Sequence, residues 1–215
     1  MILSPGRNFI FVHVPKTGGT SLALALEGRA MKDDILIGDT PKARKRRKRL
    51  KGMEARGRLW KHSTLADVEG LVSPGFIAGA FTVTMVRNPW DRLVSYYHWL
   101  RLQEFAHPAV ALAKAVDFSG FVNAEDTRAA FAAQPYGAYL TGSDGVERAS
   151  CYIRLERFAQ DAAPLWAHLG FTLDLPVSNA SPRARDYRSY YSDADAALVA
   201  ELCAEDIARF GYCFS

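Results

Sequence analysis

The stretch FIFVHVPKTGGTSLALALEG, from Phe9 to Gly28, contains the order of elements that decides the fold. Residues 9–14 are short, apolar except for His13, and followed by a proline and two glycines. This pattern is typical of a strand buried on both faces of a parallel sheet. Residues 20–28 have the leucine spacing of a helix, with Gly28 placed to end it. Strand, glycine turn and helix form the first half of a βαβ unit.

A second strand followed by a helix occurs in FTVTMVRNPWDRLVSYYHWLRLQ, residues 81–103. Residues 81–86 are typical of a buried strand. Asn88 can cap the helix that follows, with Pro89 at its first position and Asp91 at its third, close to a capping box. Further elements are predicted as a strand over 151–155, a helix over 158–169 and a last helix that begins at Ser192 and ends at Gly211.

Strands that alternate with helices favour an α/β fold. We predict three layers around a central, mostly parallel sheet, with a P-loop-like strand–loop–helix at residues 9–28. The length of 215 residues favours a single domain over 1–215. A basic excursion at about 41–58 is expected to form an exposed helix or loop within that domain.

The composition, with 49% hydrophobic and 23% charged residues, is that of a globular protein. No stretch approaches the roughly twenty apolar residues of a membrane-spanning helix, and no signal peptide is apparent. The three cysteines are an odd number without a C-x-x-C pair, which argues against a disulfide framework or a zinc site. We therefore expect a cytoplasmic protein without an integral membrane segment.

Positive charge is concentrated between Pro41 and Lys51, where eight of eleven residues are Lys or Arg, although the formal net charge is only +4. Such a run is either a solvated segment or a surface that steers an anionic glycan or nucleotide. A nucleic-acid partner is not expected, because the run has no interleaved aromatic residues and the chain shows no known nucleic-acid module.

The glycine turn is a candidate anion site. Consecutive backbone N–H groups before a helix, together with the positive end of the helix dipole, attract an anion. Hydroxyl groups and a lysine can add further donors. The alternative is an ordinary turn with a solvated lysine. The candidate residues are Lys16, Thr17, Gly18, Gly19, Thr20 and Ser21.

The position of Lys16 narrows the class of ligand. In a nucleotide-binding P-loop the lysine follows the glycines and reaches the terminal phosphates, whereas Lys16 precedes Gly18 and Gly19. No apolar strand ends in an Asp that would hold magnesium. A kinase or ATPase is therefore disfavoured, since those reactions need the metal to neutralise the phosphates.

VHVPKTGGTS beside VTMVRNPWDRLVSYYHW resembles the two cofactor-binding signatures of sulfotransferases that use 3′-phosphoadenosine-5′-phosphosulfate (PAPS). The sequence is most similar to the carbohydrate sulfotransferase branch, related to heparan 2-O- and chondroitin sulfotransferases and their bacterial relatives. The resemblance continues through WKHSTLADV, CYIRLERF and the C-terminal YYSDADAALVAELCAEDIARFGYCF. It implies a metal-free transfer of a sulfuryl group to the hydroxyl of a carbohydrate, which can itself be anionic.

The resemblance also implies residue roles. The glycine turn would hold the phosphosulfate, with Lys16 near the oxygen that leaves; a cation there stabilises the transition state more than the ground state. Arg87 and Ser95 would bind the 3′-phosphate, and Arg183, in the loop 179–183, would add a phosphate contact. The alternatives are a salt bridge from Arg87 to Asp91, a small packing residue at position 95, and an ordinary exposed arginine at position 183.

A general base is needed to accept the hydroxyl proton, and histidine is best matched to neutral pH. Among the five histidines we predict His62, because KHST resembles the histidine-containing element of the family branch; a structural role is the alternative. His13 is interpreted as a packed core histidine. Tyr136 and Tyr139, in QPYGAYL, could stack on adenine or sugar, or could lie in the core.

Two functions from other classes remain alternatives at this stage. One is a small P-loop kinase that uses ATP and magnesium. The other is a non-catalytic nucleotide- or polyanion-binding protein, whose binding would follow the basic run and fall steeply with salt.

Overall fold

A computed structural model describes residues 1–175 and 183–215 of the chain, which divide into two compact units. The described part of unit 1 comprises residues 1–86 and 136–175. The described part of unit 2 comprises residues 87–135 and 183–215. A single domain over 1–215 stays a prediction.

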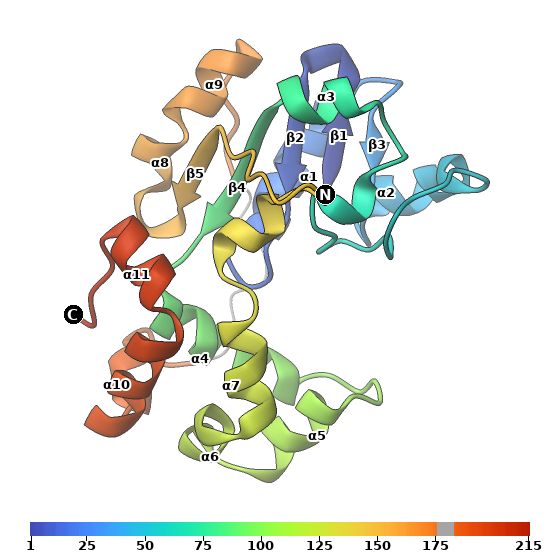
Figure 1. Ribbon diagram of the computed structural model, residues 1–215. Helices are drawn as coiled ribbons and strands as arrows, with labels where there is room; N and C mark the ends of the chain where they lie inside the picture. Colours follow the sequence, from blue (N-terminus) through green and yellow to red (C-terminus); the bar gives the residue numbers. More distant parts are fainter. Residues whose placement is uncertain (176–182) are drawn as a thin grey trace. The chain divides into compact units, whose positions relative to one another are not determined.

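Unit 1 contains a five-stranded sheet in the order β3-β1-β2-β4-β5, which runs from right to left across Figure 1. The strands are β1 (Ile2–Ser4), β2 (Phe9–Val12), β3 (Ile35–Leu36), β4 (Phe81–Val86) and β5 (Cys151–Arg154). β2 pairs with β4 and β4 with β5 in parallel, whereas β1 is antiparallel to both β2 and β3. Four of these five strands therefore run in one direction, which confirms the predicted mostly parallel α/β fold.

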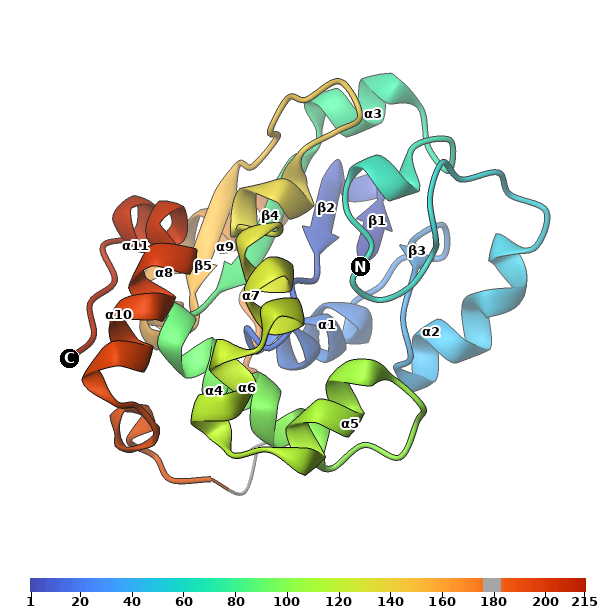
Figure 2. The ribbon, with the colours of Figure 1, turned by 60° about the horizontal axis from the view of Figure 1, so that its bottom comes forward.

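The strands of the two predicted strand–helix pairs form where expected. β4 has the predicted bounds, and β2 ends at Val12, two residues earlier than predicted. The short strands β1 and β3 were not predicted, since two or three residues carry no periodic signal. They extend the sheet beyond β2, and Figure 2 shows β2 running into the turn that precedes α1.

Helices of unit 1 cover one face of this sheet through a shared core. Phe9 and Phe11 of β2, with Val83 and Met85 of β4, pack against apolar residues of α1, α2 and α9. The alternate residues of these strands are buried as well, which fits strands covered on both faces. The helices are α1 (Gly19–Gly28), α2 (Pro41–Arg46), α3 (Pro74–Gly79), α8 (Phe158–Asp161) and α9 (Ala163–Leu169), with short 3-10 segments η1 (Pro5–Arg7), η2 (Arg47–Leu50), η3 (Ala66–Val68), η4 (Tyr136–Leu140) and η5 (Leu155–Arg157).

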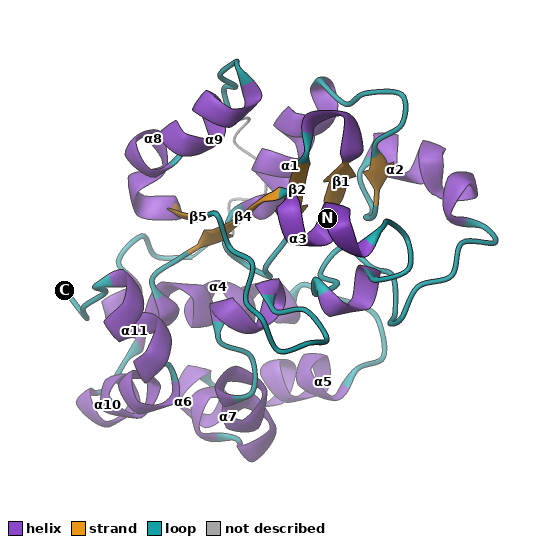
Figure 3. Ribbon diagram, turned by 45° about the horizontal axis from the view of Figure 1, so that its top comes forward, coloured by secondary structure: helices purple, strands orange, loops and turns teal. Residues whose placement is uncertain are grey.

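The described residues of unit 2 are helical, whereas the strands belong to unit 1 (Figure 3). Its elements are α4 (Pro89–Arg101), α5 (Pro108–Ala115), α6 (Phe118–Asn123), α7 (Glu125–Ala132), η6 (Tyr187–Tyr190), α10 (Asp193–Leu202) and α11 (Ala204–Phe210). The centre of this unit is aromatic. Trp90 and Tyr97 of α4 pack with Phe118 and Phe121 of α6 and with Val199 of α10.

The predicted helix caps at Asn88, Ser192 and Gly211 are confirmed, but α4 ends at Arg101, two residues before the predicted end, and two predicted helices are each divided. The Asn88 side chain caps α4 by accepting from the Trp90 N–H at 3.1 Å. Ser192 and Asp195 form a capping box at the start of α10, and Gly211 ends α11 in a left-handed conformation. The segment 158–169 is interrupted at Ala162, and the last helix at Cys203.

The basic segment 41–58 forms α2, η2 and an irregular stretch, largely exposed, as predicted. In the described part of the chain, every helix is too short or too polar to cross a membrane.

Candidate functional site

The glycine turn between β2 and α1 has an unusual backbone. Lys16 has φ +64°, one of two non-glycine residues with positive φ in the described chain, and Gly18 has φ +83°. Left-handed residues placed before a helix turn successive N–H groups toward one side, and such concavities bind anions. A side chain held in this region also costs of order 1 kcal/mol, and such strain is concentrated at functional sites.

The packing around the turn explains why positions 18 and 19 are glycine. A Cβ on Gly19 would lie 2.4 Å from Cδ2 of His13, and one on Gly18 would lie 2.8 Å from Cδ1 of Leu155. Gly19 is therefore required by the His13 ring packed against it, whereas Gly18 is favoured first by its left-handed backbone and then by the nearby Leu155 side chain. The sequence had suggested a different reason, close approach of a ligand.

The hydroxyl groups of the turn divide into two kinds. Thr17 is fully buried, and its Oγ1 donates to the carbonyl of Val14 at 2.9 Å. Its side chain therefore stabilises the turn and leaves only its backbone for a ligand. Thr20 and Ser21, at the first turn of α1, are partly exposed.

His62 contacts His13, and His13 packs against the glycine turn. Its Nδ1 is 2.8 Å from the carbonyl oxygen of His13, and the two rings meet edge to face at 4.7 Å. Because a carbonyl oxygen can only accept, Nδ1 carries the proton, and in the neutral ring Nε2 keeps a lone pair. His13 in turn packs against Gly19. The predicted base and the turn thus belong to one packed cluster in unit 1.

Burial controls the ionisation of both histidines. It lowers the pKa of His62 to about 4, helped by the positive charge of Lys61. Burial also lowers the pKa of His13 well below its usual range, with His62 adding to the effect. Both rings are therefore neutral at pH 7, the state in which the Nε2 of His62 can accept a proton.

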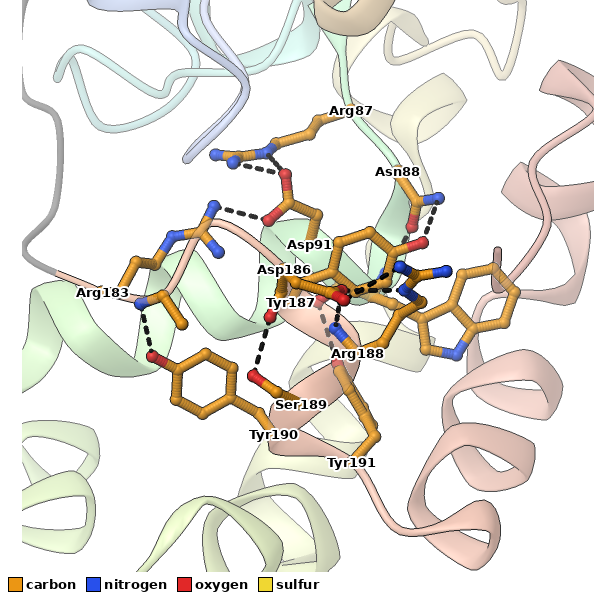
Figure 4. A network of polar contacts seen from close by, with 12 residues as sticks. Arg87, Asn88, Asp91, Arg183, Asp186, Tyr187, Arg188, Ser189, Tyr190 and Tyr191 are labelled. Carbon is orange, nitrogen blue, oxygen red and sulfur yellow. Dashed lines mark hydrogen bonds and ion pairs between the residues drawn. The ribbon is translucent and has the colours of Figure 1, made fainter.

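Unit 2 joins two of the predicted phosphate-binding arginines through one carboxylate (Figure 4). Arg87 donates to Asp91 Oδ2 through Nε at 2.8 Å and through Nη2 at 2.5 Å. Arg183 donates to Asp91 Oδ1 through Nη2 at 2.5 Å. The salt bridge between Arg87 and Asp91 is thus present. It occupies two of the five donors of that guanidinium.

Two buried nitrogens of this unit lack a hydrogen-bond partner among the described residues. They are Nη1 of Arg183 and Nε2 of His98. The ring of His98 is edge to face with Tyr190 at 5.0 Å, and burial lowers its pKa, with the charges of Arg101 and Arg183 contributing. A buried donor without a partner is costly and fits a polar group of a ligand. Ser95, predicted to bind phosphate, is buried in α4.

The ion pair between Arg87 and Asp91, named as an alternative in the sequence, is confirmed, and the spacing of four residues is the signal for it. The second pair, from Arg183 to Asp91, was not predicted, because it joins residues 92 apart and has no local signal. His98 was likewise not predicted as a member of this cluster. Tyr136 and Tyr139 are buried, in agreement with the core alternative. Of the predicted loop 179–183, only Arg183 lies within the described residues.

The described residues, 1–175 and 183–215, contain no group of three or more His, Cys, Asp or Glu side chains arranged to hold a metal ion. Among the residues predicted to hold the cofactor, the cations are Lys16 in unit 1 and Arg87 and Arg183 in unit 2.

Comparison with known proteins gives a family and a fold. A sequence profile described as the sulfotransferase family matches residues 1–213. No curated protein matches the chain. Among solved structures, mouse sulfotransferase SULT7A1 in complex with PAP is similar, with a TM-score of 0.51 and 17% sequence identity. That match covers 94% of this chain and 84% of the mouse chain.

Proposed function

Since this chain belongs to the sulfotransferase family, we propose that it transfers the sulfuryl group of PAPS to a hydroxyl of a carbohydrate acceptor. The family match supports the reaction class. The fold it shares with a mouse sulfotransferase solved with PAP supports the donor. The carbohydrate acceptor rests on the sequence resemblance to the carbohydrate branch.

The observation that carries the proposal is the backbone of the glycine turn. Lys16 and Gly18 are both left-handed, and the N–H groups that follow open the first turn of α1. This arrangement fits the phosphosulfate end of PAPS, with Thr20 and Ser21 as hydroxyl donors. PAPS supplies the sulfuryl group, and its remainder is PAP. Lys16 would stabilise the negative charge on the oxygen that leaves sulfur.

His62 is proposed as the general base. Its Nδ1–H is held by the carbonyl of His13, so the Nε2 lone pair is the one that would accept the acceptor's hydroxyl proton. The acceptor oxygen then forms its bond to sulfur. No metal is invoked, because Lys16 and the backbone N–H groups can supply the positive charge.

Arg87, Ser95 and Arg183 are proposed to bind the 3′-phosphate. The buried Nη1 of Arg183, a donor without a partner among the described residues, fits a phosphate oxygen. Arg87 and Arg183 share Asp91, so both guanidinium planes are already ordered before an anion binds.

The donor is tested by thermal unfolding with PAP, compared with ADP with and without magnesium. At a hundred times its dissociation constant, PAP should stabilise the chain by about 2.7 kcal/mol. For a protein of this size that is a rise in Tm of roughly 5–10 °C. Arg87→Ala should abolish most of the rise, whereas Arg128→Ala, an exposed arginine of α7, should keep it. An equal or larger rise with magnesium and ADP would contradict the proposed donor and favour a kinase.

A further inference from the structure

A pocket in unit 1 lies beside the proposed base and is not used by the roles assigned so far. Its volume is about 290 Å³. It is lined by residues 36–39 at the end of β3, by Ala43, Arg47 and Leu50 of the basic segment, and by residues 58–61. Three segments that are separate in the sequence therefore form its walls.

Most of the lining residues are apolar, and the charged ones are mainly cationic. Arg47, Arg58 and Lys61 contribute three positive charges and Asp39 one negative charge. Lys61 Nζ donates to Asp39 at 2.8 Å. Partial burial disfavours ionisation of Asp39, but the hydrogen bond and charge of Lys61 lower its pKa overall. With that pair neutralised, Arg47 and Arg58 leave a net charge of two for an anionic ligand.

The basic segment is divided between two roles. Lys42 donates to the carbonyl of Glu27, Arg46 to that of Met31 at 2.7 Å, and Arg49 to that of Lys32 at 2.5 Å. These three side chains tie the segment to the C-terminal end of α1 and to the loop that follows it. Arg47 lines the pocket. The three hydrogen bonds fix the backbone of the basic segment, and this gives Arg47 a defined position at the pocket.

Trp60 adds an aromatic surface at the pocket. Its side chain is large and 45% exposed, and the guanidinium carbon of Arg58 lies 5.6 Å from the centre of its ring. An exposed indole beside cations suits a sugar ring that carries an acidic group, since the apolar face of the ring can stack while the acid pairs with arginine.

The pocket is next to the proposed base. The rings of Trp60 and His62 meet edge to face at 5.0 Å, and Lys61 lies between them in the sequence. A sugar held at Trp60 would therefore present its hydroxyl groups close to the ring of His62.

We infer that this pocket is the acceptor site, and that it binds an anionic sugar unit through Arg47 and Arg58 with the ring against Trp60. The inference rests on the proposed function and defines its acceptor as an acidic saccharide. It also assigns the basic segment to acceptor recognition.

Calorimetry on the full chain at fixed salt tests the inference with two saccharides of equal length. One is a tetrasaccharide that alternates glucuronate and N-acetylglucosamine, and the other is a neutral tetrasaccharide of N-acetylglucosamine. The acidic one should bind at least about 10-fold more tightly, the equivalent of one charge-assisted hydrogen bond. Trp60→Ala should weaken the binding of both.

Two variants that each remove one positive charge distinguish binding in the pocket from a general effect of net charge. Arg58→Gln should weaken binding of the acidic tetrasaccharide by about 5- to 10-fold and leave the neutral one unchanged. Arg56→Gln removes the same charge two residues away, where the side chain is exposed and pairs with Glu69, and should change neither. Equal losses in the two variants, equal affinities for the two saccharides, or no binding of either would overturn the inference.

The PAP titration keeps the two hypotheses distinguishable. A wild-type chain that binds PAP but shows no preference for the acidic tetrasaccharide contradicts the acceptor site alone. A chain that prefers the acidic tetrasaccharide through Arg58 but is not stabilised by PAP contradicts the proposed donor and keeps the pocket.

Discussion

The glycine turn of unit 1 and the arginine cluster of unit 2 both present positive charge to an anion, but they are built differently. The turn uses backbone N–H groups and a helix end, and its geometry is maintained by His13 and Leu155 packed against Gly19 and Gly18. The cluster uses the long side chains of Arg87 and Arg183, which are held together by one carboxylate.

The difference teaches how each site can fail. A backbone site carries no counter-charge, but it tolerates no added atom at its glycines. In the side-chain site a carboxylate is needed to hold the cations in place. Arg87, Arg183 and Asp91 together therefore carry one net positive charge. Substitutions in the turn should therefore affect the chemical step or folding, whereas substitutions in the cluster should affect ligand affinity.

The largest expected effect is that of His62→Gln. Loss of a general base lowers kcat by about 10²- to 10⁴-fold. The glutamine amide can still donate to the carbonyl of His13, so PAP binding should stay within about twofold of wild type. His107→Gln, at the exposed N-cap of α5, is the control and should retain activity. A loss below about threefold would remove His62 from the mechanism.

The pH profile of wild type sharpens the same prediction. The base must be unprotonated, and burial lowers its pKa to about 4. Activity should therefore persist as the pH falls below 6.5, the usual pKa of histidine, and should be lost only as it approaches 4. The measurement is kcat/KM from short assays between pH 4 and 8. A decline centred near 6.5 would contradict the assigned ionisation state.

Lys16→Met should have the next largest effect. The side chain keeps its length but loses the charge that would stabilise the leaving oxygen, so kcat should fall by about 10²- to 10³-fold. PAP affinity should change less, because the N–H groups of the turn remain. Single-turnover kinetics with saturating PAPS measure the step directly. Lys16→Arg, which restores a cation, should recover part of the rate; a stronger effect on PAP affinity than on kcat would make Lys16 a binding residue only.

Gly19→Ala tests the packing of the turn. Its Cβ would meet the His13 ring at 2.4 Å, and overpacking of this kind costs about 1–3 kcal/mol in the free energy of unfolding. Gly28→Ala, at the other end of α1, is the matched control, because nothing lies within 4 Å of its added Cβ. Urea unfolding of the two variants gives the comparison. Equal stabilities would mean that the His13 ring moves aside without cost.

Asp91→Asn should have the smallest effect and tests the cluster. Two freed guanidiniums must be ordered again at roughly 0.5–1.5 kcal/mol each, or about 1–3 kcal/mol together, so PAP should bind at least about 5-fold more weakly. Calorimetry with PAP measures this change. Tighter binding would mean that Asp91 acts mainly as a counter-charge. Asp186→Asn, which alters the exposed pair with Arg188, should leave the affinity unchanged.

Several elements were determined by local sequence. The apolar run before Gly18 and Gly19, the strand 81–86 and the caps at Asn88 and Ser192 were all predictable, because a short apolar run or a capping side chain acts within a few residues. The two-signature resemblance likewise led to the family that the comparisons show. The helix break at Cys203 was not predictable, since the helical pattern continues through it. The break at Ala162 has a signal that the sequence analysis did not use, because Pro164 lies in the first turn of α9.

By itself, the sequence determined the strand–turn–helix order and the lysine before the glycines. Only the tertiary structure brought His62 to the carbonyl of His13, 49 residues away, and Arg183 to Asp91, 92 residues away. It also assigned Gly19 to protein packing and the basic segment to the wall of a pocket. The physical reason is the distance along the chain over which each kind of interaction acts. Propensities and caps act over a few residues, whereas hydrogen bonds, burial and the pKa shifts they cause depend on which distant segments meet.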